Sequence, residues 1–187
     1  MSGFVGISGS LRRGSFNTAL LDAATALMPQ AAELVAHGVR GIPLYDADLE
    51  AAEGIPPAVA ALKDAIAASD GLLLVTPEYN NGIPGVFKNA IDWLSRPPED
   101  VGRVFGGRPV ALIGASPGGF GTILSQGAWL PVLRTLGTDF WGGGKLYVSR
   151  APTVFSPDGV LTDATVREQL RRFLAGFTAF ALAQRRA

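Results

Sequence analysis

The sequence predicts an α/β protein, a three-layer sandwich in which helices cover both faces of a five-stranded parallel sheet. Short apolar runs, typical of buried strands, alternate along the chain with longer helical segments, and this alternation predicts right-handed βαβ units. Five strands connected in this way favour the doubly wound strand order 2-1-3-4-5. Since no repeat, linker or low-complexity segment is present, we expect one domain over residues 1–187.

The chain opens with a predicted strand at residues 3–8, which is apolar and ends in a turn rich in glycine and serine. A helix is expected from about Ser15, and Pro29 ends it. A weaker strand follows at residues 32–36. These three elements form the first predicted βαβ unit.

An irregular stretch is expected at residues 41–46, and the next helix opens at Pro56 and Pro57, since proline suits a first helical turn. The strand at 71–76 is the clearest of all, because it is short, continuously apolar and bounded by turn residues. The remaining predictions are a helix at 84–95, a strand at 109–114, a helix at about 122–136, a strand at 145–149 and a helix at about 162–185.

Composition excludes several classes of function. Lysine and arginine together number 16, as do aspartate and glutamate, and this balance argues against a nucleic-acid binder. The chain has no cysteine and one histidine, His37, which excludes disulfides, iron–sulfur ligation and histidine-rich metal sites. We accordingly expect no metal site. No signal peptide or bilayer-spanning run is evident, so we expect a cytoplasmic protein with no membrane partner.

The fold class predicts where a ligand binds. In doubly wound sheets a ligand lies beyond the carboxyl ends of the strands, where the strand order reverses. This rule brings together the loops after the first, third and fourth predicted strands, here named loop 1 (residues 9–17), loop 2 (residues 76–84) and loop 3 (residues 115–121).

Loop 1 leads from a strand into a helix and carries hydroxyl, amide and guanidinium groups in the sequence GSLRRGSFN. A helix N-terminus offers unpaired N–H groups and partial positive charge, which suit a phosphate, and arginine adds charge-assisted hydrogen bonds. From the residues alone, an ordinary turn with Ser15 as the N-cap is an equal alternative. The G-x-G-x-x-G fingerprint is absent, and the P-loop pattern fails because Leu146 follows Lys145.

Loops 2 and 3 carry groups suited to a planar cofactor. Loop 2 is polar, contains two prolines and places Tyr79 at the predicted ligand edge. Loop 3, with the sequence ASPGGFG, can bring backbone N–H groups close to a ligand. Taken singly, each loop is also compatible with an ordinary structural turn.

Together, the three loops resemble the NADPH-dependent FMN reductase family, which includes chromate, quinone and azo-dye reductases. The sequence VTPEYNNGIPGVFKNAIDWLS at residues 75–95 resembles the family hallmark, GSLRRGSFN its phosphate loop and SPGGFG its third flavin loop. The resemblance covers residues 3 to about 150 and implies a flavodoxin-like fold with bound FMN. It also implies homodimers or homotetramers with the flavin near the subunit interface. Residues 125–144 depart from the family pattern, and their role stays open.

The resemblance assigns cofactor contacts in the three loops to the phosphate, the isoalloxazine and the pyrimidine edge in turn. These residues are Ser10, Arg12, Ser15, Phe16 and Asn17; Pro77, Glu78, Tyr79 and Asn80; and Ser116, Pro117, Gly118 and Gly119. No residue is assigned as catalytic, because the flavin carries the chemistry.

The implied reaction passes hydride from NADPH or NADH to N5 of FMN and on to a quinone, chromate, an azo compound or free flavin. Since nicotinamide and acceptor need the same flavin face, we expect a ping-pong mechanism. The N–H groups of Gly118 and Gly119 are expected to stabilise charge at the flavin N1 edge. The sequence leaves open the physiological acceptor and the choice between NADPH and NADH. Candidate partners for a 2′-phosphate are Arg13, Arg103 and Arg108.

Two other functions remain as alternatives. The first is a flavodoxin-type electron-transfer carrier without its own NAD(P)H turnover, which balanced charge and Arg12 disfavour. The second is a flavin-free nucleotide-binding or regulatory domain. Among single residues, we interpret Glu78 as fixing its loop rather than as a catalytic carboxylate, and His37 as structural.

The segment 79–94 is predicted to form a homo-oligomer contact. It carries more apolar and aromatic surface than one helix can turn toward its own sheet. The residues that suggest this contact are Tyr79, Ile83, Phe87 and Trp93.

Overall fold

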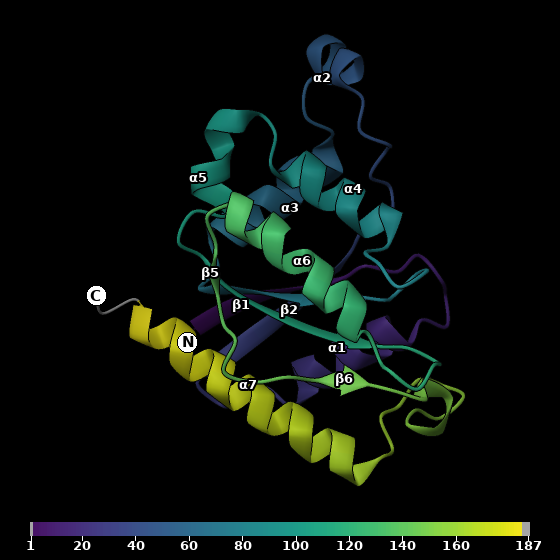
Figure 1. Cartoon of the computed structure of the whole chain (residues 1–187). Coiled ribbons are helices and arrows are strands. Elements are labelled where there is room, and N and C mark those ends of the chain that lie inside the picture. Colours follow the sequence, from purple (N-terminus) through teal and green to yellow (C-terminus); the bar gives the residue numbers. More distant parts are fainter. Residues whose placement is uncertain (1, 185–187) are drawn as a thin grey trace.

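The computed structural model, which describes residues 2–184, has one parallel sheet between two layers of helices (Figure 1). The strands are β1 (Ser2–Ser8), β2 (Ala32–Gly38), β3 (Gly71–Val75), β4 (Pro109–Ala115), β5 (Asp139–Phe140) and β6 (Tyr147–Val148). Their order across the sheet is β2-β1-β3-β4-β5, and β6 also pairs with β4. The α/β class and the strand order 2-1-3-4-5 are therefore confirmed.

The fifth strand differs from the prediction of one strand at residues 145–149. The structure divides it into β5 and β6, which pair with the same edge of β4 at Val110 and at Ala115. Between them the chain leaves the edge at residues 142–144, which are all glycine, and glycine weakens a strand interior because it offers no side chain to pack. These glycines make room for Trp141, since a Cβ on Gly143 would lie 2.6 Å from the indole nitrogen.

The helices that the sequence predicts are present with shifted ends. They are α1 (Phe16–Ala26), α3 (Pro57–Ala67), α4 (Gly85–Leu94), α6 (Ile123–Thr135) and α7 (Ala164–Gln184). Two further helices, α2 (Ala47–Glu53) and α5 (Val101–Val104), were not predicted. The first buries none of its residues and the second is a single turn, so neither produces an apolar periodicity.

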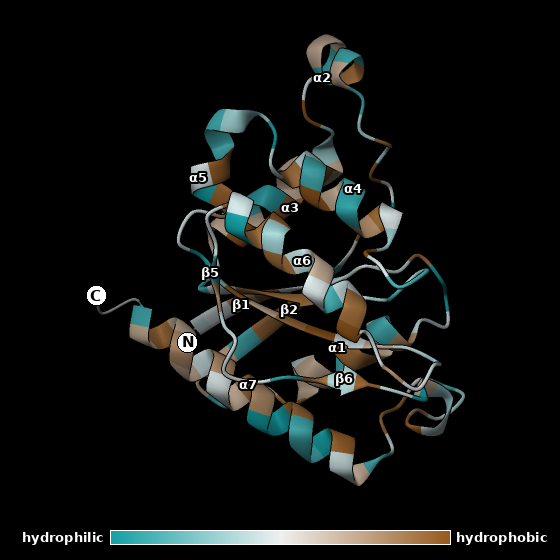
Figure 2. Cartoon of the chain, in the orientation of Figure 1, coloured by the Kyte–Doolittle hydropathy of each residue, from teal (hydrophilic) through white to brown (hydrophobic). Residues whose placement is uncertain are grey.

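Each face of the sheet has its own apolar core. Helices α1 and α7 cover one face, which carries Phe4 of β1, and α3, α4 and α6 cover the other, which carries Val5 and Ile7 (Figure 1). The inner strands β3 and β4 are accordingly buried along their whole length, as expected for a parallel sheet covered on both sides, and they carry the apolar residues of the sheet centre (Figure 2).

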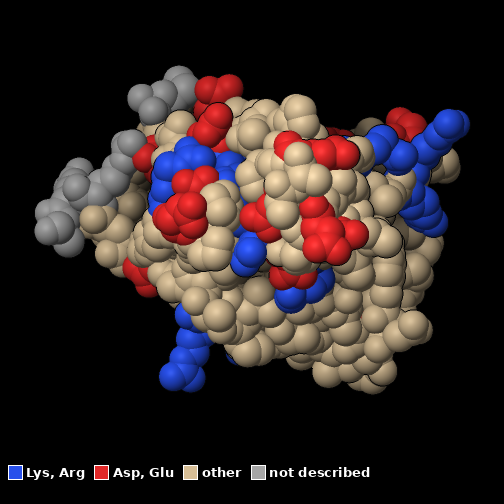
Figure 3. Space-filling model, turned by 90° about the horizontal axis from the view of Figure 1, so that it is seen from above, with Lys and Arg blue, Asp and Glu red and all other residues tan. Residues whose placement is uncertain are grey.

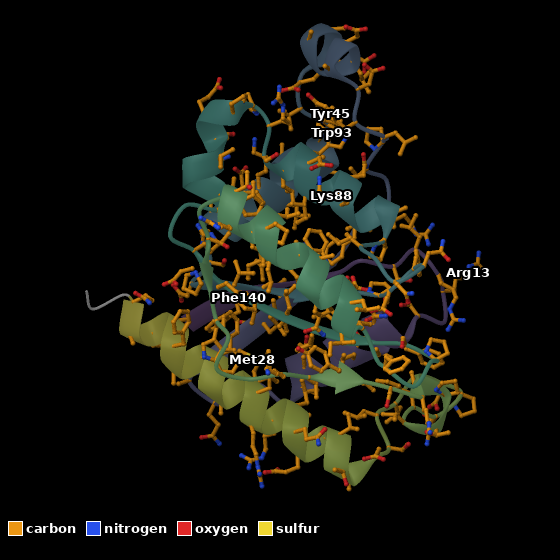
Figure 4. All side chains as sticks on the ribbon, in the orientation of Figure 1. Arg13, Met28, Tyr45, Lys88, Trp93 and Phe140 are labelled. Atoms are coloured by element: carbon orange, nitrogen blue, oxygen red, sulfur yellow. The ribbon has the colours of Figure 1, made fainter. Side chains whose placement is uncertain are left out.

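The prediction that Phe87 and Trp93 form a subunit contact is wrong, because both side chains are fully buried within the chain. The Phe87 ring lies 5.1 Å from that of Trp129. On the other side of α4, Trp93 donates from Nε1 to the Pro43 carbonyl at 2.9 Å and packs against Tyr45 (Figure 4). The segment before α2 thus covers the second apolar face of α4, whereas Tyr79, the other aromatic residue of the predicted contact, is 49% exposed.

In the view from above, acidic side chains are scattered over the middle of the face with a few basic ones between them, and basic side chains gather at the right-hand edge (Figure 3). A broad uncharged area borders this face in the same view. Within residues 2–184, no helix combines the length and apolarity needed to cross a bilayer.

Candidate functional site

The three loops meet at one cleft at the carboxyl edge of the sheet. Its lining comes from loop 1, loop 2 and loop 3, as the switch-point rule predicts. The lining residues are Ser10, Arg12, Ser15, Phe16, Asn17, Pro77, Glu78, Tyr79, Ala115, Ser116 and Pro117. Asn80, Gly118 and Gly119, which were assigned to the flavin, do not line this cleft and are exposed beside it.

Loop 1 ends in a well-formed helix N-terminus. Ser15 is the N-cap of α1, and its Oγ accepts hydrogen bonds from the N–H groups of Asn17 and Thr18 at 3.2 and 3.3 Å. The remaining first-turn N–H groups have no partner within a helix and are available to an anion. The N-cap interpretation and the phosphate interpretation of this loop are therefore compatible.

The two adjacent arginines of loop 1 point to different places. Arg12 lines the cleft, where its guanidinium donates to the Gly14 carbonyl and lies 5.1 Å above the centroid of the Phe16 ring. Arg13 lines a separate hollow beside α1 and projects from the outer edge of the molecule (Figure 4). Arg12 is thus the arginine placed to contact a ligand in the cleft.

Asn17 joins loop 1 to loop 3. Its amide nitrogen donates to the Ala115 carbonyl and its amide oxygen accepts from the Ala115 N–H, both at 2.9 Å, and the residue is buried. Two short bonds to one backbone unit fix the spacing between loop 1 and loop 3. The side chain of Asn17 therefore positions the cleft walls.

Loop 2 makes a tight turn at its tip. Tyr79 and Gly82 exchange both backbone hydrogen bonds, at 3.2 and 3.0 Å. The two central residues, Asn80 and Asn81, have positive φ angles of 49° and 60°, as a type I′ turn requires and as asparagine tolerates better than most residues. The turn holds Tyr79, half of which is exposed, at the cleft.

Glu78 fixes loop 2 to the N-terminus of α6. Its Oε2 accepts from the N–H groups of Leu124 and Ser125 at 2.9 and 3.0 Å, where Thr122 provides no side-chain cap. A carboxylate at this position satisfies two orphan N–H groups and interacts favourably with the helix dipole. The interpretation of Glu78 as a loop-fixing residue is confirmed.

A buried polar network next to Glu78 was missed by the sequence analysis. The Thr76 hydroxyl lies 2.9 Å from Ser125 Oγ and accepts from Trp129 Nε1 at 3.0 Å. Its members come from two segments about fifty residues apart, so nothing in the local sequence indicates the contact. Together with Glu78, this network makes α6 a rigid support for loop 2.

Loop 3 is held from behind by the chain around β6. Ser116 donates from its hydroxyl to the Gly121 carbonyl at 2.5 Å, and its N–H donates to Val148. Gly121 has a positive φ of 64°, and a Cβ there would lie 2.8 Å from the backbone of Tyr147, so only glycine fits. The Arg150 N–H donates to the Gly118 carbonyl at 2.9 Å, which fixes the exposed glycines beside the cleft.

Two predicted candidates for a 2′-phosphate partner are misplaced. Arg108 precedes β4 at the opposite edge of the sheet and donates to the carbonyls of Val104 and Ser69. Arg103 pairs with Asp64 at 2.9 Å. Both guanidiniums are thus engaged far from the carboxyl edge, and the prediction that they meet a nucleotide there is wrong.

His37 lies on the edge strand β2 and is not part of the cleft lining. Partial burial lowers its pKa, since desolvation disfavours the charged imidazolium. Within residues 2–184, no group of three or more acidic, histidine or cysteine side chains is placed to hold a metal ion. The cleft therefore has the character of a cofactor site with a polar, cationic end and walls of backbone and aromatic groups.

A doubly wound sheet with such a cleft at its switch point defines a flavodoxin-like protein. Residues 3–153 match the model of the NADPH-dependent FMN reductase family, and the chain belongs to this family. As a member it is an oxidoreductase with FMN as cofactor and NAD(P)H as reductant. The donors at the loop 1 end, namely Arg12, Ser15 and the N-terminus of α1, fit the single terminal phosphate of FMN.

Similar proteins agree with this assignment. An NAD(P)H-dependent FMN reductase of Pseudomonas aeruginosa is 43% identical over 91% of this chain and 90% of its own length. A 2-hydroxy-1,4-benzoquinone reductase of a Burkholderia species is 36% identical over 93% of each chain. The solved structure of FerB, a flavoenzyme NAD(P)H:(acceptor) oxidoreductase from Paracoccus denitrificans, superposes with a TM-score of 0.87 at 33% identity, covering 98% of this chain and 99% of that one.

Proposed function

We propose that this protein reduces quinones and other small electrophilic acceptors with hydride from NAD(P)H by a ping-pong mechanism. We also propose that the whole chain forms a single FMN-binding domain. The observation that carries the proposal is the joining of the three loops into one cleft whose cationic end lies at the N-terminus of α1. Relatives named for quinone reduction support the choice of acceptor. We also propose a cytoplasmic location, where NAD(P)H is available to such an enzyme.

The residues of the chain act by binding and orientation. Bound FMN supplies the hydride chemistry between NAD(P)H and the acceptor. Arg12, Ser15 and the first turn of α1 would bind the phosphate, and the N–H groups of Gly118 and Gly119, which are exposed beside the cleft, would donate to the flavin edge where negative charge develops. Asn17 and Glu78 hold the cleft walls in place, so little reorganisation is needed during turnover.

We expect initial rates measured over a matrix of NAD(P)H and quinone concentrations to give parallel double-reciprocal lines. Both substrates need the same open face of the cofactor, so NAD(P)⁺ departs before the quinone binds. An electron-transfer carrier without its own turnover would show no NAD(P)H oxidation in this assay. Intersecting lines would show that both substrates bind together and would overturn the ping-pong part of the proposal.

We further propose that the exposed face of α6 packs against a second copy of the chain. No charged residue lies between Arg108 and Arg134, and the helix is brown at its N-terminal end in Figure 2. Exposed apolar side chains follow this face: Ile123, Leu124 and Leu130 are 43%, 49% and 44% exposed, and Phe140 beside them is 37% exposed. A hollow of about 340 Å³ between Leu130 and Phe140 can receive a partner's side chain.

This surface begins directly after loop 3, so the contact would place a second subunit beside the cleft. A two-fold contact buries the same patch on both copies and is the commonest arrangement for such an apolar surface. Residues 125–144, which depart from the family pattern, contribute much of it. The proposal replaces the contact through Phe87 and Trp93, which their burial rules out.

Leu130→Glu is expected to convert the oligomer to a monomer, because it places a charge in the centre of the α6 surface. Light scattering at micromolar concentration measures the mass of both proteins. Val160→Glu, a change at a half-exposed apolar residue outside α6, is the matched control and should leave the mass unchanged. A wild-type monomer, or a Leu130→Glu oligomer of unchanged mass, would contradict this contact.

A further inference from the structure

A chain of ring contacts leads from the cleft into the protein core. The Arg12 guanidinium lies 5.1 Å above the Phe16 ring, and the Phe16 ring stacks on that of Phe155 with centroids 5.9 Å apart and an interplanar angle of 28°. Arg12 is exposed, Phe16 is half-buried and Phe155 is 5% exposed. The two contacts through Phe16 therefore link the exposed side chain of Arg12 to the buried ring of Phe155.

Phe155 is fixed by the hairpin that carries it. Its N–H donates to the Ala151 carbonyl at 3.2 Å, and it pairs with Leu161 in an antiparallel bridge. On either side of this bridge, Ser156 donates to Val160 at 2.9 Å and Thr162 donates to Val154 at 3.0 Å. The ring belongs to the core under α1 and α7, so it cannot turn away from Phe16 without disturbing that core.

The position of Arg12 needs such a support. An exposed arginine samples many rotamers, and ordering it on a ligand has an entropic cost. Besides the Phe16 ring, the guanidinium has one partner in the described structure, the Gly14 carbonyl within the same loop. A ring that is itself held in place restricts the guanidinium to the cleft before any ligand arrives.

We propose that Phe155 is a positioning residue for phosphate binding, acting through Phe16 on Arg12. The inference rests on the proposed FMN site, and it concerns a residue beyond position 153, where the family match ends. Phe155 does not line the cleft, and its ring contacts the Phe16 ring instead. Its effect is therefore specific to ligands that carry the terminal phosphate.

The test compares two ligands that differ only in that phosphate. FMN and riboflavin are titrated into apo protein, and the ratio of their dissociation constants reports the phosphate contribution alone. We expect Phe155→Leu to raise the FMN dissociation constant by roughly 3- to 10-fold, the scale of one aromatic or cation–π contact, and to leave that of riboflavin within about 2-fold. Phe155→Tyr keeps the ring and should retain the wild-type ratio.

Two further variants separate positioning from a general loss of packing. Phe177→Leu alters another buried ring of the same core cluster, which contacts Phe4 and not Phe16, and should leave the ratio unchanged. In an Arg12→Ala background, Phe155→Leu should have no further effect on the ratio, since the residue through which it acts is gone. If Phe155→Leu does not fold, Phe16→Leu removes the middle ring and should produce the same selective loss.

Two results would contradict the positioning role of Phe155. Equal weakening of FMN and riboflavin by Phe155→Leu, or an additive effect in the Arg12→Ala background, would show that Phe155 has only a packing role. Wild-type protein that binds FMN no better than riboflavin would instead contradict the proposed phosphate site itself. The two failures are thus distinguishable in one set of titrations.

Discussion

Trp93→Glu should lower the free energy of unfolding by about 3–5 kcal/mol or more, the range seen when a large core aromatic is lost. Trp93 is fully buried between the sheet-facing core and the segment around Pro43, so glutamate there would be an unpaired buried charge. The loss is a large share of the roughly 5–15 kcal/mol that stabilises a typical domain. We expect most of the mutant to be unfolded or bound in aggregates.

Urea denaturation followed by far-UV circular dichroism measures this effect. Lys88→Gln is the matched control on the same helix. The side chains of the Lys88–Asp92 ion pair are 39% and 43% exposed, so losing the pair should lower the free energy of unfolding by no more than about 1 kcal/mol. A Trp93→Glu protein that unfolds at the wild-type urea concentration but has a smaller mass would contradict the intrachain packing. It would also restore the subunit contact that burial excludes.

Arg12→Ala should weaken FMN binding by about 1.5–3 kcal/mol, the range for a hydrogen bond to a charged group, which corresponds to roughly a 10- to 150-fold higher dissociation constant. Arg12 is the guanidinium that lines the cleft beside the N-terminus of α1. The protein should remain folded, because the side chain is exposed and tied only to its own loop and to Phe16.

Flavin fluorescence titration at fixed ionic strength measures the dissociation constants, and Arg13→Ala is the neighbouring control. Arg13 lies in the hollow outside the cleft, so its removal should change FMN affinity much less. Equal losses for the two variants would mean that long-range charge, not a placed contact, attracts the phosphate. A similar loss for riboflavin would assign Arg12 to a different part of the flavin.

The sequence was sufficient for the features that depend on local pattern. Continuous apolar runs between turn residues located β3 and β4, and alternation with helices gave the strand order and hence the meeting of the three loops. The role of Glu78 followed from its place in a rigid loop, although its partners, the N–H groups of Leu124 and Ser125, are 46 and 47 residues away.

Features that depend on distant contacts could not be predicted. The aromatic excess of α4 suggested a partner subunit, because nothing in the sequence shows that Pro43 and Tyr45 return to cover Trp93. The split of the fifth strand follows from room made for Trp141, a packing effect with no periodic signal. The stack from Arg12 to Phe155 joins loop 1 to a hairpin more than 130 residues later.

The most direct test of the assigned reaction is an anaerobic titration that observes its two halves separately. Protein loaded with one FMN per chain is mixed with one equivalent of NAD(P)H, and one equivalent of quinone is added afterwards. We predict that the yellow flavin absorbance bleaches with NAD(P)H alone and returns in full with the quinone. Protein that fails to bind added FMN, or whose bound flavin NAD(P)H does not bleach, would contradict the account.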